Sequence, residues 1–171
     1  MLAGLGLRLG IGLKATAESR RDRTYPFIHK AEELLTLIRT TGHTHVGLAL
    51  DTWNWKVGAG GMEHLSELMG KQIVTVTIAD VPADADLEKI DATQRFLPTE
   101  ETIPAYAQFV ASLAERKYDG PVTVLAASRH VSGMTRDYSI DKCALLLEQI
   151  WSRAGLSKPG RPALSAAEFA K

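Results

Sequence analysis

The 171-residue chain has a single cysteine, Cys143, and no excess of charge of either sign. One cysteine excludes an internal disulfide, and its apolar helical surroundings predict a small buried side chain in a reducing compartment, the cytoplasm. Twenty basic residues balance twenty acidic ones, which argues against nucleic acid and anionic lipid as partners. No apolar run approaches the ~20 residues of a membrane span. The expectation is a globular protein with neither kind of partner.

What the sequence does contain is typical of one globular domain. Hydrophobic residues make up 45% of the chain and charged residues 23%. The apolar opening is interrupted by Arg8 and lacks a basic start and a cleavage site, so we expect a first strand there rather than a signal peptide. We expect the domain to span residues 1–154. The Pro- and Gly-broken segment 155–171 is expected to be a loosely attached tail.

A strand-then-helix pattern occurs four times along the chain. Alternating or continuous apolar runs predict strands in 7–14, 45–51, 72–80 and 121–128, and helical spacing predicts helices in 27–40, 63–69, 104–117 and 140–154. Strands that alternate with helices are typical of parallel sheets joined by right-handed crossovers. The prediction is an α/β fold with four parallel strands in sequential order and helices on one face.

Side-chain alternation within these strands separates two faces of the sheet. The predicted helix-covered face is apolar and carries Leu9, Ile11, Leu13, Val46, Leu48, Leu50, Val74, Val76, Ile78, Val122 and Val124. The opposite face is mostly small or mildly polar and carries Arg8, Gly10, Gly12, Gly47, Ala49, Asp51, Thr75, Thr77, Thr123 and Leu125. Such a face is expected to line a cavity. A two-layer sheet with one solvated face would give a similar pattern.

Four segments, in their order and spacing, resemble a known family. They are VGLALDTWNW, VTIADVP, RFLPTEETIP and KYDGPVTVLAASRH. Together they are similar to the second half of the sugar phosphate isomerase/epimerase family, the xylose isomerase-like TIM barrels, over roughly residues 7–151. The resemblance implies the (β/α)4 half of a TIM barrel. It also implies a divalent metal (Mn, Co, Mg or Zn) held at the strand ends by two glutamates, an aspartate and a histidine, where a sugar is isomerised by proton transfer between neighbouring carbons.

Most of the ligand positions that the resemblance implies are not occupied by ligands in this sequence. Asp51 matches the family aspartate, but Asn54 and Thr77 stand at histidine positions, and Gly12 and Leu125 at glutamate positions. The chemistry needs several ligands that converge on one ion to stabilise the ene-diolate. We therefore expect a catalytically degenerate relative that binds no metal as it stands. The alternative is an active metal-dependent sugar isomerase/epimerase in a fuller chain or assembly.

Other residues are candidates for substrate binding. Arg95 matches the family's substrate or phosphate arginine, although the Pro-Gly-Glu-Gly that usually follows is absent. Arg129 and His130 follow the fourth strand, on the face where this fold places its chemistry. Trp53 could stack on a sugar ring or pack under a loop. Asp51 could also simply cap the next turn.

Two weaker hypotheses concern ligands. Asp51, Asp80 and His130 could form a replacement metal site, and a loop with Arg20, Arg21 and Arg23 could hold a sugar phosphate or be solvated. The expected ligand is a sugar or sugar phosphate.

The length of the chain bears on its partners. A (β/α)8 barrel typically needs about 250 residues, so the four units correspond to half of one. The open possibilities are a truncated reading frame that lacks the N-terminal half, a homodimer of half barrels, and a two-layer module that is stable alone.

Overall fold

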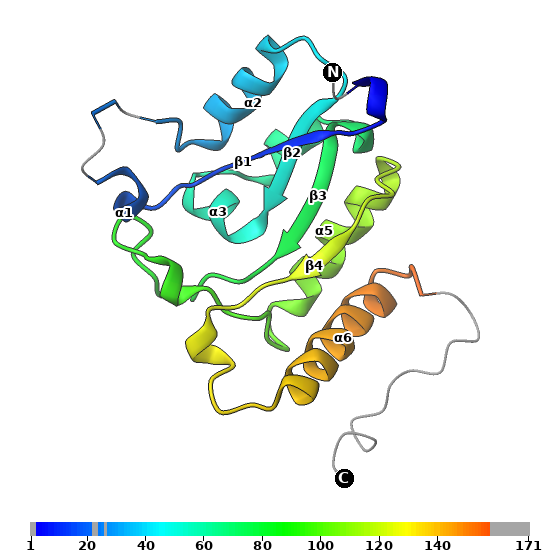
Figure 1. Cartoon of the computed structure of the whole chain (residues 1–171). Coiled ribbons are helices and arrows are strands. Elements are labelled where there is room, and N and C mark those ends of the chain that lie inside the picture. The colour runs from blue at the N-terminus through cyan, green and yellow to red at the C-terminus, as the bar shows by residue number, and fades with distance from the viewer. Residues whose placement is uncertain (1–2, 22–23, 26, 158–171) are drawn as a thin grey trace.

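The computed structural model describes residues 3–21, 24–25 and 27–157. Its four strands form a single parallel sheet in sequential order, as predicted (Figure 1). They are β1 (Leu9–Gly12), β2 (Val46–Asp51), β3 (Ile73–Ile78) and β4 (Val122–Val124). The sequential order confirms the α/β prediction, since each strand lies beside the next strand in the sequence.

Helices follow each strand. They are α1 (Ala17–Arg20), α2 (Ala31–Thr40), α3 (Thr52–Val57), α4 (Met62–Ser66), α5 (Ile103–Glu115) and α6 (Arg136–Arg153). Short 3-10 turns are η1 (Ala3–Leu5), η2 (Gly70–Gln72), η3 (Ala92–Gln94) and η4 (Ser128–His130). Within the described ranges, none of the helices has the length and apolar character needed to cross a membrane.

The helices differ from their predictions in three places. The helix predicted from residue 140 starts at Arg136, because the Thr135 hydroxyl accepts the Tyr138 N–H at 3.2 Å and caps it. The helix predicted from residue 27 starts only at Ala31. The short helix α3 was not predicted. The expected C-terminal tail lies outside the described residues from position 158 onward.

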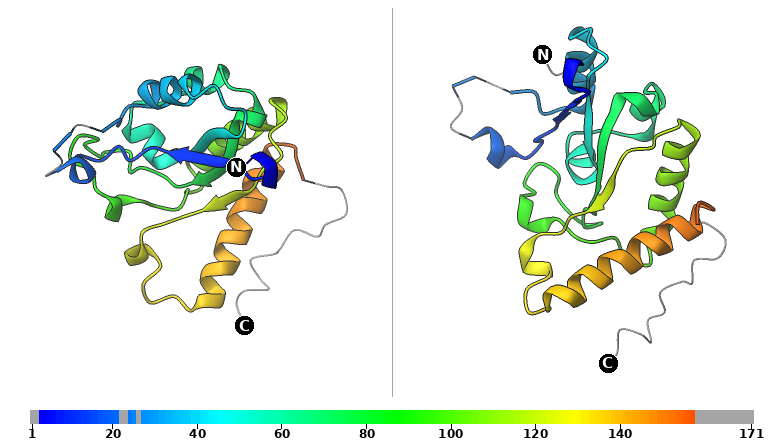
Figure 2. Two further views of the ribbon diagram at one scale, coloured as in Figure 1. Left: turned by 45° about the horizontal axis from the view of Figure 1, so that its top comes forward. Right: turned by 45° about the vertical axis from the view of Figure 1, so that its right-hand side comes forward.

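The core lies between the outer face of the sheet and the helices. Leu48, Leu50, Ile73, Val76 and Ile78 are each at most 1% exposed, and they form one cluster with side chains of α2, α5 and α6. The helices follow this outer side of the sheet, from α2 near β1 and β2 to α6 beyond β4 (Figures 1 and 2). Burial of this face stabilises the fold by removing apolar surface from water.

The prediction for Val74 was wrong. Leu48 pairs with Ile73, but the next residue, Ala49, pairs with Thr75, so Val74 is an extra residue in β3. In this bulge Ile73, not Val74, takes the helix-covered position, and Val74 approaches the inner face: a Cβ added at Gly10 would lie 3.3 Å from Val74 Cβ. Strict alternation along the sequence cannot reveal an inserted residue.

Gly47 allows β2 and the start of β3 to approach closely. A Cβ at this position would lie 2.4 Å from the Gln72 carbonyl oxygen, which belongs to the backbone and has little room to move. Glycine is therefore required by the distance between the two strands.

We predict that Gly47→Ala lowers the free energy of unfolding by about 1–3 kcal/mol, because the added methyl group overpacks against backbone. The measurement is chemical denaturation followed by circular dichroism. Gly12→Ala is the matched control, since a Cβ there has its nearest contact at 3.5 Å, with the Ala49 oxygen. Equal stability of the two variants would contradict the proposed close approach.

Candidate functional site

Both carboxylate oxygens of Asp51, at the end of β2, have partners. Oδ1 accepts the Asn54 N–H at 2.9 Å, which caps α3. Oδ2 accepts a hydrogen bond from each of the two terminal nitrogens of the Arg95 guanidinium, both at 2.7 Å. The side chains are only 20% and 11% exposed, so this is a largely desolvated ion pair. Asp51 thus has the capping role that the sequence left open.

The backbone around Arg95 is fixed from two sides. Asp80 and Phe96 form an isolated antiparallel bridge, with N–H to oxygen distances of 2.8 and 3.1 Å. On the other side, Ala127 N–H donates to the Arg95 carbonyl at 2.8 Å. The long segment between β3 and α5 is therefore tied to the ends of β3 and β4, and this brings Arg95 to Asp51.

Trp53 lies beneath this ion pair. The guanidinium carbon of Arg95 is 5.2 Å from the Trp53 ring centre, a cation–π contact. The indole N–H donates to the Gln94 carbonyl at 3.1 Å, and the residue is 1% exposed. Packing accounts for Trp53, because no ring face is left open for a sugar.

Burial raises the pKa of Asp51 above its ordinary value of 3.8. The capping N–H of Asn54 and the charge of Arg95 act in the opposite direction without cancelling that effect. A raised folded-state pKa means that the folded chain binds this proton more tightly than the unfolded chain. The contribution of Asp51 to stability therefore decreases as pH rises from 3.8 toward the folded-state pKa.

The other positions of the implied ligand set carry no acid or imidazole. Thr77 pairs with Asp51 in the sheet, and its hydroxyl lies 3.3 Å from that of Thr123. Asn54 Oδ1 accepts the Ala15 N–H at 3.2 Å. Leu125 follows β4 and is 51% exposed, while Gly12 ends β1. Gly12, Thr77 and Leu125 lie at or just after the C-terminal ends of their strands, as the repeated strand–helix units predict, and Asn54 lies in α3, just after β2.

The residues of the hypothetical replacement site have other partners. Asp80 Oδ1 accepts the Val81 N–H at 2.8 Å and the Tyr106 hydroxyl at 3.1 Å. Burial first, and then the charge of Asp80, raises the pKa of Tyr106, so this phenol stays a hydrogen-bond donor. Within the described part of the chain, no three His, Cys, Asp or Glu side chains are grouped so that they could hold a metal ion.

His130 and Arg129, two of the substrate-binding candidates from the sequence, lie in η4 after β4. The His130 ring stacks on Phe96, with centroids 3.8 Å apart, and its Nε2 is 3.0 Å from the Thr93 oxygen and 3.2 Å from Arg129 Nε. His130 and Phe96 border a pocket of about 440 Å³. Its other lining residues are Leu97, Pro98, Thr99, Glu100, Ile103, Lys142, Leu145, Leu146 and Gln149.

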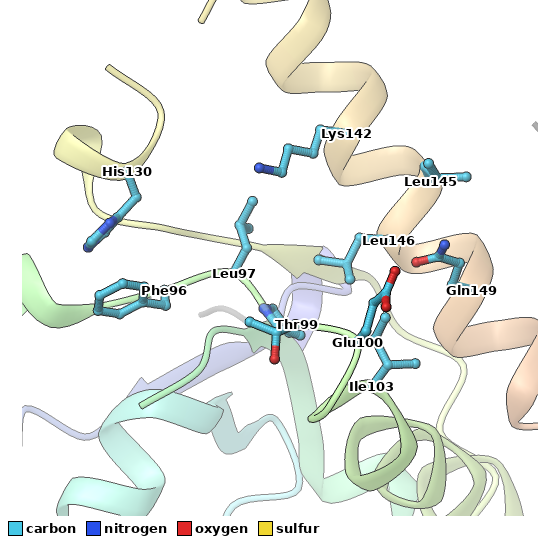
Figure 3. A pocket seen from close by; sticks show the side chains of 11 residues that line it. Phe96, Leu97, Thr99, Glu100, Ile103, His130, Lys142, Leu145, Leu146 and Gln149 are labelled. Carbon is cyan, nitrogen blue, oxygen red and sulfur yellow. The ribbon is translucent and has the colours of Figure 1, made fainter. Parts of the chain in front are cut away.

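The pocket is closed on one side by α6. Lys142 extends from this helix toward the side of Leu97 and His130, and Glu100 lies near Gln149 (Figure 3). The volume is within the usual range for small-molecule sites, and the walls combine apolar side chains with a few polar groups. No sequence signal identified it, because its two walls are about 40 residues apart.

The predicted arginine loop is described only in part. Arg20 Nε donates to the Thr16 carbonyl at 3.4 Å, and Arg21 is exposed. Arg23 lies outside the described residues.

Comparison with known protein families identifies the fold family of this chain. The sequence model of the xylose isomerase-like TIM barrel matches residues 12–143. The chain belongs to this family. A search of curated proteins finds no match.

Several solved structures superpose on most of the chain. A xylose isomerase domain protein from Alicyclobacillus acidocaldarius subsp. acidocaldarius is 25% identical, with a TM-score of 0.70 over 91% of this chain and 53% of that one. The IolI protein with a bound zinc atom is 15% identical, with a TM-score of 0.69 over 92% and 52%. A xylose isomerase domain containing protein from Salmonella typhimurium LT2 is 19% identical, with a TM-score of 0.58 over 90% and 52%. This chain therefore spans about half the length of these relatives.

We predict that Arg95→Met lowers the free energy of unfolding by about 2–4 kcal/mol at pH 7, because it leaves the Asp51 carboxylate largely buried without its cation. The pKa of Asp51, followed by carbon-13 NMR of its carboxyl group, should rise further. The loss of stability should shrink as pH falls below that pKa, since a protonated Asp51 needs no cation.

The control is Arg129→Met, which removes the same charge from an exposed side chain. It should change the free energy of unfolding by less than about 0.5 kcal/mol. An Arg95 variant as stable as this control would show that the ion pair is not structural.

Proposed function

We propose that this chain is a catalytically degenerate member of its family, which keeps the scaffold as a small-molecule binding module without the metal. The observation that carries the proposal is the state of Asp51. Its Oδ1 accepts the capping N–H and its Oδ2 accepts the guanidinium of Arg95. The residues present do not fit a divalent metal, because the remaining implied ligand positions are Gly12, Asn54, Thr77 and Leu125.

The ion pair itself supports the absence of a metal. The Arg95 guanidinium supplies the positive charge beside Asp51, so a metal ion would have to displace it and would gain only one carboxylate. Metals of this type bind through several oxygen or imidazole donors at once. Without such an ion, nothing at these positions could stabilise an ene-diolate intermediate.

We predict that the purified chain binds Mn²⁺, Co²⁺, Mg²⁺ and Zn²⁺ no more tightly than about 100 µM, a weak affinity for a protein site. The quadruple variant Gly12→Glu, Asn54→His, Thr77→His and Leu125→Glu should gain metal affinity and should be stabilised by added metal. Elemental analysis after dialysis, calorimetric titration and thermal melts with and without manganese measure these effects.

The control is the same quadruple variant with Asp51→Asn, which should lose most of the gained affinity. Stoichiometric metal retained by the natural chain would favour the alternative, an active metal-dependent isomerase or epimerase in a fuller chain or assembly. A quadruple variant that folds but shows no response to metal would mean that the four ligand positions are assigned wrongly.

For the ligand, we propose a sugar phosphate in the pocket beside α6. Lys142 forms no ion pair within the described part of the chain, so its ammonium group is free to bind phosphate. Glu100 and Gln149 offer hydrogen bonds to hydroxyl groups, and the Phe96 ring offers an apolar surface. The pocket therefore combines one cation with groups suited to a polyol.

We predict that Lys142→Met weakens the binding of an aldose phosphate about fivefold or more, the loss expected for one ion pair of roughly 1 kcal/mol. The unphosphorylated sugar should bind equally well to the variant and to the natural chain. Calorimetric titration with both compounds makes the comparison, and Lys56→Met, on the exposed side of α3, is the control. No binding of either compound to the natural chain would contradict this site.

The cellular setting is part of the same proposal. We place the chain in the cytoplasm, in carbohydrate metabolism. Burial raises the pKa of the Cys143 thiol, so it is a poor nucleophile at neutral pH and fits a structural rather than a redox role.

A further inference from the structure

Both outer strands of the sheet have one unpaired edge. Within the described ranges, β1 pairs only with β2, and β4 pairs only with β3. Their outward N–H and C=O groups have no ladder partner, and such edges readily pair with another strand. The two edges are of similar length, four residues in β1 and three in β4.

The outer face of β1 has apolar side chains that no helix covers. Leu9 shares this face with Ile11, which is partly covered by the core, but Leu9 itself is 47% exposed. Leu7, two residues earlier, is 51% exposed. On β2 and β3 the corresponding side chains Leu48, Leu50, Ile73, Val76 and Ile78 are buried under helices, so Leu7 and Leu9 are much more exposed than these.

The helix at the opposite edge of the sheet, α6, has an apolar flank that is not fully buried. α6 packs against α5 and lies beyond β4 (Figure 1). One of its flanks carries Ile140, Ala144, Leu147 and Trp151, at positions i, i+4, i+7 and i+11 of a helix. Ile140 is 54% exposed, whereas Leu147 and Trp151 are partly buried and pack in part against the core of the same chain. The pocket-lining residues Leu145 and Gln149 lie on the other flank, toward the segment that precedes α5.

We propose that two copies of this chain associate edge to edge and close an eight-stranded barrel. In this dimer β1 of each copy lies parallel to β4 of the other. The Ile140 flank of α6 then covers Leu7 and Leu9 of the other copy. The exposed apolar side chains Leu7 and Leu9 of one copy would thereby contact Ile140 of the other.

A second copy fits these edges for geometric reasons. A two-fold axis along the barrel makes the two β1–β4 contacts identical, so the assembly closes with no edge left over. Solved relatives, of which this chain spans about half, have the length of two such sheets. The balance of twenty basic and twenty acidic residues means that no net charge repels the second copy.

The exposed apolar side chains contribute part of the surface that a dimer would bury. Leu7, Leu9, Leu125 and Ile140 alone expose roughly 350 Å² per copy, so two copies would bury about 700 Å² through them. The paired strand edges and the rest of the α6 flank add to this area. Specific interfaces typically bury about 1,200–2,000 Å² in total.

Closure would also complete the strand-end site. Leu125 of one copy would lie beside Gly12 of the other, and two Asp51–Arg95 pairs would share one barrel mouth. This inference does not depend on the proposed loss of metal, since it rests on the two edges and α6.

The test is light scattering coupled to size-exclusion chromatography, on the full chain over a range of concentrations. A dimer of twice 18.6 kDa is expected. Leu9→Lys and Ile140→Glu should each raise the Kd of the dimer about tenfold or more, because each places a charge in an apolar contact. Met62→Lys, at a side chain that is 45% exposed on α4, is the control and should leave the dimer intact.

Mixing the two edge variants gives the sharper test. A heterodimer of the Leu9→Lys chain with the Ile140→Glu chain has one natural edge and one edge with opposite charges, so it should form more tightly than either variant alone. Circular dichroism checks that both variants fold. A natural chain that stays monomeric, a dimer that resists both substitutions, mixing without recovery, or a ladder of larger species would each overturn the closed dimer.

Discussion

The Asp51 carboxylate organises the C-terminal end of the sheet. It is a charge that the fold removes largely from water, and it is stable there only because a backbone N–H and a guanidinium satisfy it. The first partner fixes the start of α3, and the second fixes the long segment that leads to α5. Three parts of the chain thus converge on one side chain. The Trp53 ring completes the arrangement by packing beneath the cation.

An arginine and a metal ion satisfy a buried carboxylate in different ways. A metal ion attracts ligands from all directions and stays bound only if several donors surround it. A guanidinium arrives on its own side chain, is always charged, and needs no further anions. With Arg95 in place, neighbouring strand ends can therefore carry Gly12, Thr77 and Leu125 without leaving Asp51 unbalanced. On the proposed loss of the metal, this would be the physical reason why the aspartate remains when the other implied ligands are absent.

Much of the fold could be predicted from the sequence, because strand and helix periods are local properties. The apolar runs located all four strands, and their alternation with helices gave their order and parallel direction. Three features were not predictable in this way. The bulge at Val74 is invisible to alternation, α3 is too short for a periodic signal, and the Asp51–Arg95 pair joins residues 44 positions apart. The α6 pocket depends likewise on tertiary packing, so only the structure brought Lys142 and Phe96 together.

The bulge at Val74 changes which face of the sheet the side chains of β3 point toward. A single additional residue early in β3 shifts the side-chain alternation by one position. The side chains before it therefore point to the opposite face from the one that simple alternation would give. Ile73 therefore faces the helices, and Thr75 and Thr77 still share a face with Asp51. The strand thus keeps the correct side chains on each face at both of its ends, although it contains one residue more than strict alternation allows. A relative that lacks this residue would need its β2–β3 connection displaced by one position to present the same groups at the barrel mouth.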